Sequence, residues 1–206
     1  MNKIRTILAD DHAVVRTGLA ALLDAEPDID VVGEAEDGAE AVRSAVRLRP
    51  DVVVMDLMMP VRDGIDATRE IHAALPETKI LVLTTSGVSD DIARALDAGA
   101  SGAILKSAPN AKLIAAIRAV AAGKSAVSDD VRKMLRADPP IPDLTDRQLE
   151  ILASVTRGFT NQDIARQLGI REDSVKEHLY NIFAKIGASN RAEAVAIALR
   201  KHLLKI

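Results

Sequence analysis

The sequence has no cysteine in its 206 residues and no apolar run long enough to cross a membrane. Without cysteine there is no disulfide and no thiolate metal site, which fits a reducing compartment. A membrane helix needs roughly 18 consecutive apolar residues. The apolar stretch after Lys3 and Arg5 ends at Asp10, which is too early for a secretory signal peptide. We therefore expect a cytoplasmic protein that does not insert into membranes.

The sequence also lacks internal repeats, low-complexity tracts and a strong net charge, since its formal charge is −3 at pH 7. The charge is unevenly distributed, however. Residues 144–206 contain 10 Lys and Arg against 7 Asp and Glu, whereas residues 1–143 contain 17 against 23. This asymmetry predicts two domains with different partners, although the basic excess is too small to indicate nucleic acid by itself.

Short β-branched runs alternate with amphipathic stretches from residue 4 to about 122. Nearly continuous apolar strands separated by helices predict a parallel sheet that is covered on both faces. We therefore predict a doubly wound α/β fold with five strands. The predicted strands are 4–9, 30–35, 51–56, 79–84 and 102–105. The predicted helices are 13–24, 38–48, 64–74, 90–98 and 109–122.

A proline-rich stretch at residues 137–143 separates this region from the rest of the chain. Each proline lacks an amide donor and restricts the residue before it, so no helix can continue through the stretch. We predict a first domain at 1–122, a linker at 123–143 and a second domain at 144–206. The second domain shows no strand pattern. Its predicted helices are 146–157, 161–167, 172–185 and 190–203.

Polar side chains stand at the carboxyl ends of four predicted strands: Asp10 and Asp11, then Asp56, Thr84 and Lys106. In a parallel sheet these ends share one edge, where ligand sites form. Each residue alone also fits an ordinary role as a helix cap, a turn residue or a solvated side chain. Together they predict a site where carboxylates bind Mg²⁺ and Asp56 meets a phosphoryl group that a hydroxyl and an amine stabilise.

Residues 1–122 resemble the receiver domain of two-component response regulators. The matching motifs are Asp10-Asp11, Asp56-Leu57-Met58-Met59-Pro60 with Asp63-Gly64, Leu83-Thr84, and Gly99-Ala100-Ser101-Gly102 leading to Leu105-Lys106. The resemblance implies a flavodoxin-like sheet in which Asp56 is the phosphoacceptor. It implies that Mg²⁺ is bound by Asp10, Asp11, Asp56 and the backbone carbonyl of Met58. It also implies that Thr84 is the switch hydroxyl and that Lys106 pairs with the phosphoryl oxygens.

Three positions depart from the receiver pattern. Ala103 stands where most relatives have Tyr or Phe, so the usual aromatic switch is missing. Thr85 is bulkier than the Ala or Gly common at its position, which predicts narrower access for a phosphoryl group. Ser107 follows Lys106 where close relatives often have Asp. The phosphorylation residues are intact, and the open question is how the site communicates with the surface.

The region after the linker has the marks of a helix-turn-helix. Thr145 and Gln148 form a capping-box pattern, and Thr160 can cap the next helix. Leu168-Gly169-Ile170 then forms a short turn before a third helix. Two helices joined by a glycine-containing turn are typical of this motif, although a plain helical bundle also fits.

A longer set of residues resembles the LuxR-type DNA-binding domain. The set consists of Leu144-Thr145-Asp146-Arg147-Gln148-Leu149-Glu150-Ile151-Leu152, Gly158, Thr160-Asn161, Ile164-Ala165, Leu168, Val175-Lys176, His178, Ile182, Lys185-Ile186-Gly187 and Asn190-Arg191-Ala192-Glu193-Ala194. This resemblance covers residues 144–203. Together with the receiver pattern it indicates the NarL/FixJ class of response regulator.

The helix at 172–185 is the predicted recognition helix. Its apolar face consists of Val175, Leu179, Ile182 and Ile186. The opposite face would enter the major groove, where the resemblance implies that Lys176 reads base edges and that Glu177 and Tyr180 help to set the site. The implied phosphate contacts are Asn161, Ser174, His178 and Lys185. Glu177 equally fits a solvated face and His178 a packing role. Arg191 is expected to pair within the fold, and residues 190–203 resemble the helix that dimerises on DNA.

These features predict a transcription regulator whose Asp56 is phosphorylated by a sensor histidine kinase, and which binds double-stranded DNA as a homodimer. One alternative is a constitutively dimeric DNA-binding protein with a receiver that does not switch, as Ala103 would allow. Another is a Mg²⁺-dependent phosphohydrolase with an aspartyl intermediate. Such enzymes usually need a second acid two residues after the nucleophile, where this chain has Met58. We therefore expect no enzyme activity beyond phosphorylation and dephosphorylation of Asp56 itself.

Overall fold

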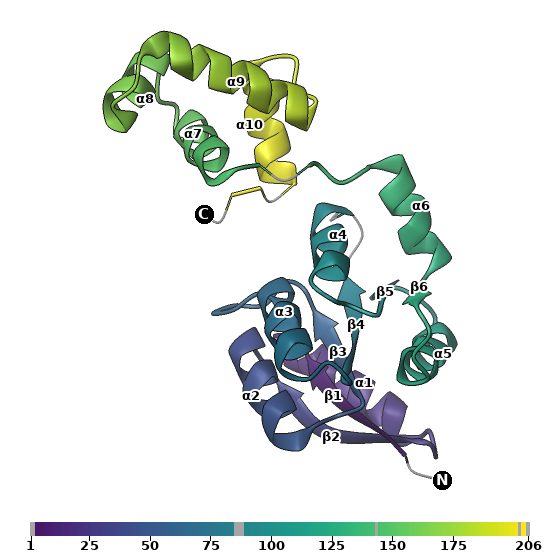
Figure 1. Ribbon diagram of the computed structural model, residues 1–206. Coiled ribbons are helices and arrows are strands. Elements are labelled where there is room, and N and C mark those ends of the chain that lie inside the picture. Colours follow the sequence, from purple (N-terminus) through teal and green to yellow (C-terminus); the bar gives the residue numbers. More distant parts are fainter. Residues whose placement is uncertain (1–2, 85–88, 143, 202, 205–206) are drawn as a thin grey trace. The chain divides into compact units, whose positions relative to one another are not determined.

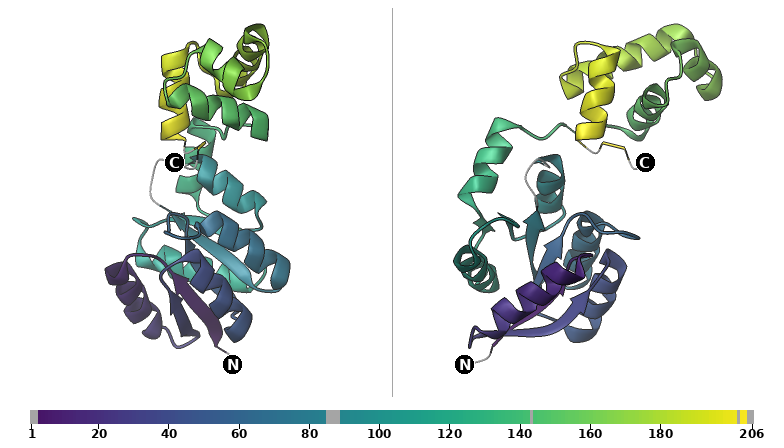
Figure 2. Two further views of the ribbon diagram at one scale, coloured as in Figure 1. Left: turned by 90° about the vertical axis from the view of Figure 1, so that its left-hand side faces the viewer. Right: turned by 180° about the vertical axis from the view of Figure 1, so that it is seen from behind.

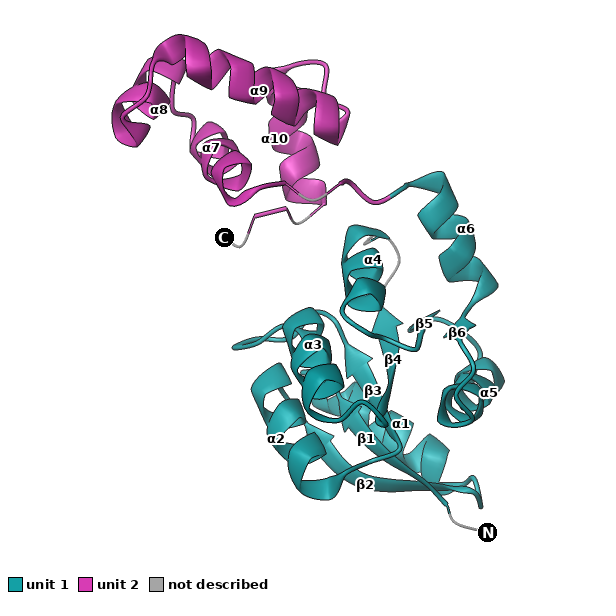
Figure 3. Cartoon of the chain, viewed as in Figure 1, with its two compact units in different colours: residues 1–139 teal, residues 140–206 magenta. Residues whose placement is uncertain are grey.

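The computed structural model describes residues 3–84, 89–142, 144–201 and 203–204 (Figure 1). The chain divides into two compact units, residues 1–139 and 140–206, and each is considered by itself (Figure 3). Thr85 and Asp143 lie outside the described residues. No described helix combines the length and the apolar character needed to cross a membrane.

The first unit is a parallel sheet of six strands with helices on both faces (Figures 1 and 2). The strand order is β2-β1-β3-β4-β5-β6. The strands are β1 (Ile4–Ala9), β2 (Ile29–Ala35), β3 (Val52–Asp56), β4 (Lys79–Thr84), β5 (Gly102–Leu105) and β6 (Ala126–Val127). The helices are α1 (Ala13–Asp24), α2 (Gly38–Leu48), α3 (Gly64–Ala74), α4 (Ser89–Asp97), α5 (Asn110–Ala121) and α6 (Asp129–Ala137). The predicted doubly wound α/β fold is confirmed, but the sheet has six strands rather than five.

Successive strand residues face opposite sides of this sheet, which explains why the interiors of the central strands β3 and β4 are apolar. Leu8 and Val54 belong to a core cluster with residues of α1 and α5. Their neighbours Ile7 and Val53 belong to a second cluster with residues of α2 and α3. Near β4 and β5, a third cluster includes Ile92 of α4. Both faces of the sheet are therefore covered by helices, and the polar residues of the predicted site lie where the strands end.

Residues 123–143, predicted as a linker, contain β6 and α6. A two-residue strand leaves no readable periodicity, so β6 could be found only through its parallel pairing with β5. The proline run that suggested a linker begins at Pro139, after α6 has ended. Upstream of it, Val131, Met134 and Leu135 follow the three- and four-residue spacing of an amphipathic helix. Within the predicted linker, residues 126–127 and 129–137 have regular structure, and the described residues after α6 have none.

The second unit contains the helices α7 (Asp146–Thr156), α8 (Asn161–Leu168), α9 (Glu172–Ile186) and α10 (Arg191–Arg200). Thr145 and Gln148 form the predicted capping box at α7, and Thr160 caps α8 as predicted. Gly169 ends α8 with a φ of 63°, a left-handed conformation that suits glycine. The four helices share one apolar core, to which α9 contributes Val175, Leu179, Ile182 and Ile186.

Candidate functional site

Four neighbouring strands deliver the predicted polar residues to one edge of the sheet. Asp10 follows β1, Asp56 ends β3, Thr84 ends β4 and Lys106 follows β5. These strands are adjacent and parallel, so their carboxyl ends lie together. Asp10, Asp56 and Thr84 are buried. The structure therefore brings together side chains that are up to 96 residues apart in the sequence.

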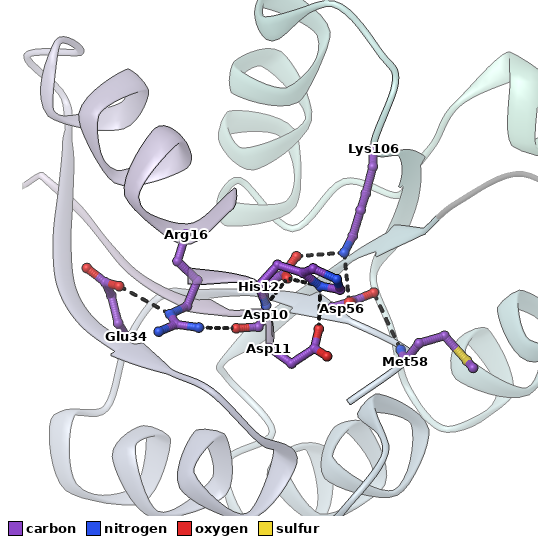
Figure 4. A network of polar contacts seen from close by, with 8 residues as sticks. All are labelled: Asp10, Asp11, His12, Arg16, Glu34, Asp56, Met58 and Lys106. Atoms are coloured by element: carbon purple, nitrogen blue, oxygen red, sulfur yellow. Dashed lines mark hydrogen bonds and ion pairs between the residues drawn. The ribbon is translucent and has the colours of Figure 1, made fainter. Parts of the chain in front are cut away.

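Lys106 connects the two buried carboxylates (Figure 4). Its Nζ lies 2.7 Å from Asp10 Oδ2 and 2.7 Å from Asp56 Oδ2. The backbone amide of Met58 donates to the other oxygen of Asp56, at 3.4 Å. Both oxygens of Asp56 thus have polar contacts, and one of these contacts is to a positive charge.

Asp56 and Lys106 both have shifted pKa values. Burial raises the pKa of Asp56 above its ordinary value, and the hydrogen bond from Lys106 opposes that rise. Burial by itself would lower the pKa of Lys106, but its contacts with Asp10 and Asp56 outweigh burial and raise the pKa. Lys106 therefore stays charged, whereas the anionic form of Asp56 is costly until further positive charge is present.

The residues around Asp56 fit a divalent cation. Ligand atoms of Asp10, Asp11, His12 and Asp56 all lie within 4.8 Å of one another. Asp10 Oδ2 is buried, and its polar partner among the described residues is Lys106 Nζ, at 2.7 Å. Carboxylate oxygens are the ligands that Mg²⁺ prefers. The acidic cluster therefore has the donor set expected of the magnesium site of a receiver domain.

The sequence interpretation missed His12 and Arg16, which hold this cluster in place. His12 Nδ1 lies 2.7 Å from Asp11 Oδ1, and the His12 amide donates to Asp10 Oδ1 at 2.9 Å. Arg16 donates to the backbone carbonyl of Asp10 at 2.6 Å and pairs with Glu34 at 3.3 Å (Figure 4). The available signal was position, since His12 follows the acidic pair directly and Arg16 lies one helical turn further on.

The loop after β3 is shaped by one glycine. A Cβ at Gly64 would lie 2.0 Å from the backbone carbonyl oxygen of Asp56, so only glycine allows this close approach. The amide of Gly64 donates to the carbonyl of Leu57 at 2.9 Å, which fixes the loop behind the acceptor. Val61 has a φ of 63° and is 89% exposed. The Met58 side chain is half exposed, and the role of its carbonyl stays a prediction.

The second unit presents the predicted DNA contacts on and beside α9. Lys176, Glu177, Tyr180 and Lys185 are exposed, while Ser174 and His178 are partly buried. Asn161, at the start of α8, is partly buried, and its Oδ1 accepts from Arg191 at 3.4 Å. Arg191 also donates to the carbonyl of Phe159, which confirms that it pairs within the fold.

Lys176 is held by acids of its own helix. Its Nζ lies 3.1 Å from Asp173 Oδ1 and 3.5 Å from Glu172 Oε1. The hydrogen bond to Asp173 raises the pKa of Lys176. All three side chains lie largely in solvent, so the contacts can be exchanged for others. Any DNA contact of Lys176 would compete with Asp173.

Comparisons with known proteins match both units. Residues 6–118 match the family described as the response regulator receiver domain, and residues 142–198 match bacterial regulatory proteins of the luxR family. The chain is 44% identical to the transcriptional regulatory protein LiaR of Bacillus subtilis, over 98% of this chain and 99% of LiaR.

Two solved structures are also similar to this chain. One is the response regulator ChrA of a heme-sensing two-component system, which has 39% identity and a TM-score of 0.60 and covers 99% of this chain and 100% of ChrA. The other is RcsB from Salmonella enterica serovar Typhimurium, bound to a promoter with a beryllofluoride phosphomimetic. It has 26% identity and a TM-score of 0.72 and covers 97% of this chain and 99% of RcsB.

The family matches fall on the two units separately, and the relatives match along almost the whole chain. The buried acidic cluster with Lys106 lies in the first matched region, and the capped α8–Gly169–α9 turn lies in the second. The chain therefore belongs to the two-component response regulators that join a receiver domain to a LuxR-type DNA-binding domain.

Proposed function

We propose that Asp56 accepts a phosphoryl group from a sensor histidine kinase and that this event controls sequence-specific DNA binding by residues 144–206. In the transfer, a carboxylate oxygen of Asp56 bonds to phosphorus while the bond between phosphorus and the kinase's histidine nitrogen breaks and leaves its electron pair on that nitrogen. The observation that carries the proposal is the contact of buried Asp56 with Lys106 beside the acidic cluster.

The remaining residues of the cluster have assigned roles in this proposal. Asp10, Asp11, Asp56 and the carbonyl of Met58 would hold Mg²⁺, which when bound neutralises charge on the phosphoryl oxygens. Lys106 already lies 2.7 Å from the acceptor oxygen and would pair with the phosphoryl group. Thr84 would supply a hydroxyl to it. Within this scheme residues 1–122 form the predicted receiver, and residues 123–143, whose β6 and α6 pack onto it, lead to the DNA-binding domain.

The kinase partner is supported by exposed apolar side chains that follow the site residues in the sequence. Val14 lies in the first turn of α1, two residues after His12, and is 87% exposed, and Val61 lies in the loop after β3. A substitution such as Val14→Asp should therefore slow transfer from a histidine kinase but leave phosphorylation by acetyl phosphate unchanged. An equal loss with both donors would mean that Val14 supports the site itself.

On the DNA side, Lys176, Glu177 and Tyr180 would read bases in the major groove, and Asn161, Ser174, His178 and Lys185 would contact phosphates. RcsB, with which this chain aligns along most of its length, was solved on DNA. We propose that this chain likewise binds DNA, as a homodimer formed after phosphorylation. Access to chromosomal DNA would place it in the cytoplasm.

The decisive test compares DNA affinity with and without beryllofluoride and Mg²⁺, on a duplex selected in vitro from a random library. We expect tighter binding with the phosphomimetic. Equal affinities would instead support a constitutively dimeric regulator, for which the buried Ala103 is the relevant observation. Repeated turnover of a small phosphate ester would support the phosphohydrolase, which Met58 in place of a second acid disfavours.

A further inference from the structure

Helix α6 is packed onto the receiver unit at α4 and β5. Val131 has no exposed surface and joins the apolar cluster that contains Ile92 of α4 and Ala103 of β5. Met134 and Leu135, three and four residues further on, pack against the same cluster. The apolar face of α6 thus packs against the receiver unit, which makes α6 part of this domain rather than a free connector.

The start of α6 is anchored by backbone hydrogen bonds. The amide of Ser128, which caps α6, donates to the carbonyl of Ala103 at 2.9 Å. One residue earlier in β5, a Cβ at Gly102 would lie 2.8 Å from the carbonyl oxygen of Ala126. This close approach requires glycine at position 102. The pairing of β6 with β5 therefore fixes the position at which α6 begins.

Ala103 is small because of its surroundings. It is fully buried in the cluster that Val131 enters, and β6 is paired along its backbone. An aromatic ring at position 103 would overfill the packed cluster. Such a ring and α6 in its present position would therefore exclude each other. The small side chain of Ala103 thus leaves room for docked α6.

A side-chain hydrogen bond joins the end of α6 to the start of α4. Ser89 Oγ donates to Asp138 Oδ2 at 2.7 Å, across 49 residues of sequence. Ser89 is 1% exposed and begins α4, five residues after Thr84. Asp138 is the C-cap of α6 and lies two residues before Pro140, where the second unit begins. This hydrogen bond therefore joins the segment after the switch threonine to the segment before the DNA-binding unit.

We propose that α6 is the element that carries the signal from Asp56 to the DNA-binding unit, in place of an aromatic side chain at position 103. The unphosphorylated state keeps α6 docked through Val131 and through the Ser89–Asp138 hydrogen bond. Phosphorylation moves the Thr84 end of β4 and the start of α4, which breaks that bond and frees the end of α6. The inference rests on the proposed phosphorylation of Asp56. To the proposed function it adds the structural route from Asp56 to the DNA-binding unit.

The test uses the full chain and two readouts, hydrogen exchange of the α6 amides and affinity for the selected duplex. Ser89→Ala and Asp138→Ala should each expose α6 to exchange and raise DNA affinity without beryllofluoride by roughly three- to tenfold, the factor for one hydrogen bond. The double variant should do no more than either single variant, because both remove the same contact. Asp138→Asn keeps an acceptor oxygen and should behave like the wild type.

Asp130→Ala is the matched control, because this acid lies on the same helix but pairs with Lys112, at 3.4 Å. It should leave both readouts unchanged. If the wild type responds to beryllofluoride while Ser89→Ala and Asp138→Ala bind DNA and exchange as the wild type does, α6 is not the route and the inference is wrong. If the wild type itself shows no response, the proposed function fails and this inference fails with it.

Discussion

The phosphoacceptor site and the recognition helix use charged residues in opposite ways. At the site, Asp10, Asp56 and Lys106 come from three strands, and each carboxylate lies 2.7 Å from the same ammonium. On α9, Lys176 and its acidic partner Asp173 come from one helical turn and are largely exposed. The first arrangement is buried and depends on the whole fold. The second depends on a single helix.

This difference determines how substitutions should behave. Groups that share a buried partner are coupled, so removing one changes the energy of the others. Exposed groups on a helix contribute smaller amounts, and only direct partners such as Lys176 and Asp173 are coupled. We therefore expect all-or-none effects at the phosphoacceptor site and graded effects on α9.

The largest effect should come from Asp56→Asn. The amide cannot act as the nucleophile, so phosphate incorporation from acetyl phosphate and Mg²⁺ should be lost completely, as mass spectrometry of the intact protein can show. The beryllofluoride response in DNA binding should disappear with it. Asp24→Asn is the control, since Asp24 is an exposed acid at the end of α1. Incorporation that survives Asp56→Asn would place the acceptor elsewhere.

The next effect, graded rather than complete, should come from Lys176→Gln. If Lys176 reads bases, affinity for the selected duplex should fall by about 5- to 150-fold, and discrimination against substituted sites should fall as well. Lys124→Gln, at an exposed position outside the DNA-binding unit, should change neither. A loss that is uniform across sequences, with a salt dependence reduced by about one unit, would make Lys176 a phosphate contact instead.

A gain of binding should come from Asp173→Asn, because it releases Lys176 and removes a negative charge. An exposed ion pair is weak, so only a small gain in DNA affinity, about 1.5- to 5-fold, is expected. The gain should shrink when Lys176→Gln is already present. Asp146→Asn, an exposed acid in the first turn of α7, controls for effects on the helix dipole. Unchanged affinity would show that Asp173 does not restrain Lys176.

The same contrast explains which features could be predicted from the sequence. Asp10, Asp56, Thr84 and Lys106 each end or follow an apolar strand, so the rules of parallel sheets place them together. The buried face of α9 follows from helical spacing alone. Both predictions depend on periodicity, which a single sequence displays.

The features that sequence analysis missed depend on contacts between distant segments. β6 exists because Gly102 lets residue 126 approach closely, and nothing near residue 126 signals this. The bond from Ser89 to Asp138 is equally invisible in the sequence. The pairing of Lys176 with Asp173 was within reach, because residues three apart on a helix are neighbours.

The smallest effect concerns stability, where burial makes Asp56 costly. Its pKa is raised in the folded protein, so the folded chain binds the proton more tightly than the unfolded chain. Stability is therefore lost as the pH rises from the ordinary carboxyl pKa of about 4 through the raised value. At pH 7 without Mg²⁺, Asp56→Asn should raise the melting temperature, and the gain should shrink as the pH falls through the raised pKa and the wild-type carboxyl takes up its proton.

Mg²⁺ should reverse the order of the melting temperatures of the wild type and Asp56→Asn. A cation beside Asp10 and Asp56 stabilises the carboxylate but gains less from a neutral amide, so the wild type should gain melting temperature and Asp56→Asn should gain less. Calorimetry in EDTA and in Mg²⁺ measures the melting temperature of each protein in each condition. A lower melting temperature for Asp56→Asn in EDTA would mean that the Lys106 contact outweighs the cost of burial. The buried site would then be stabilised by its charges, as Lys176 and Asp173 stabilise each other in solvent.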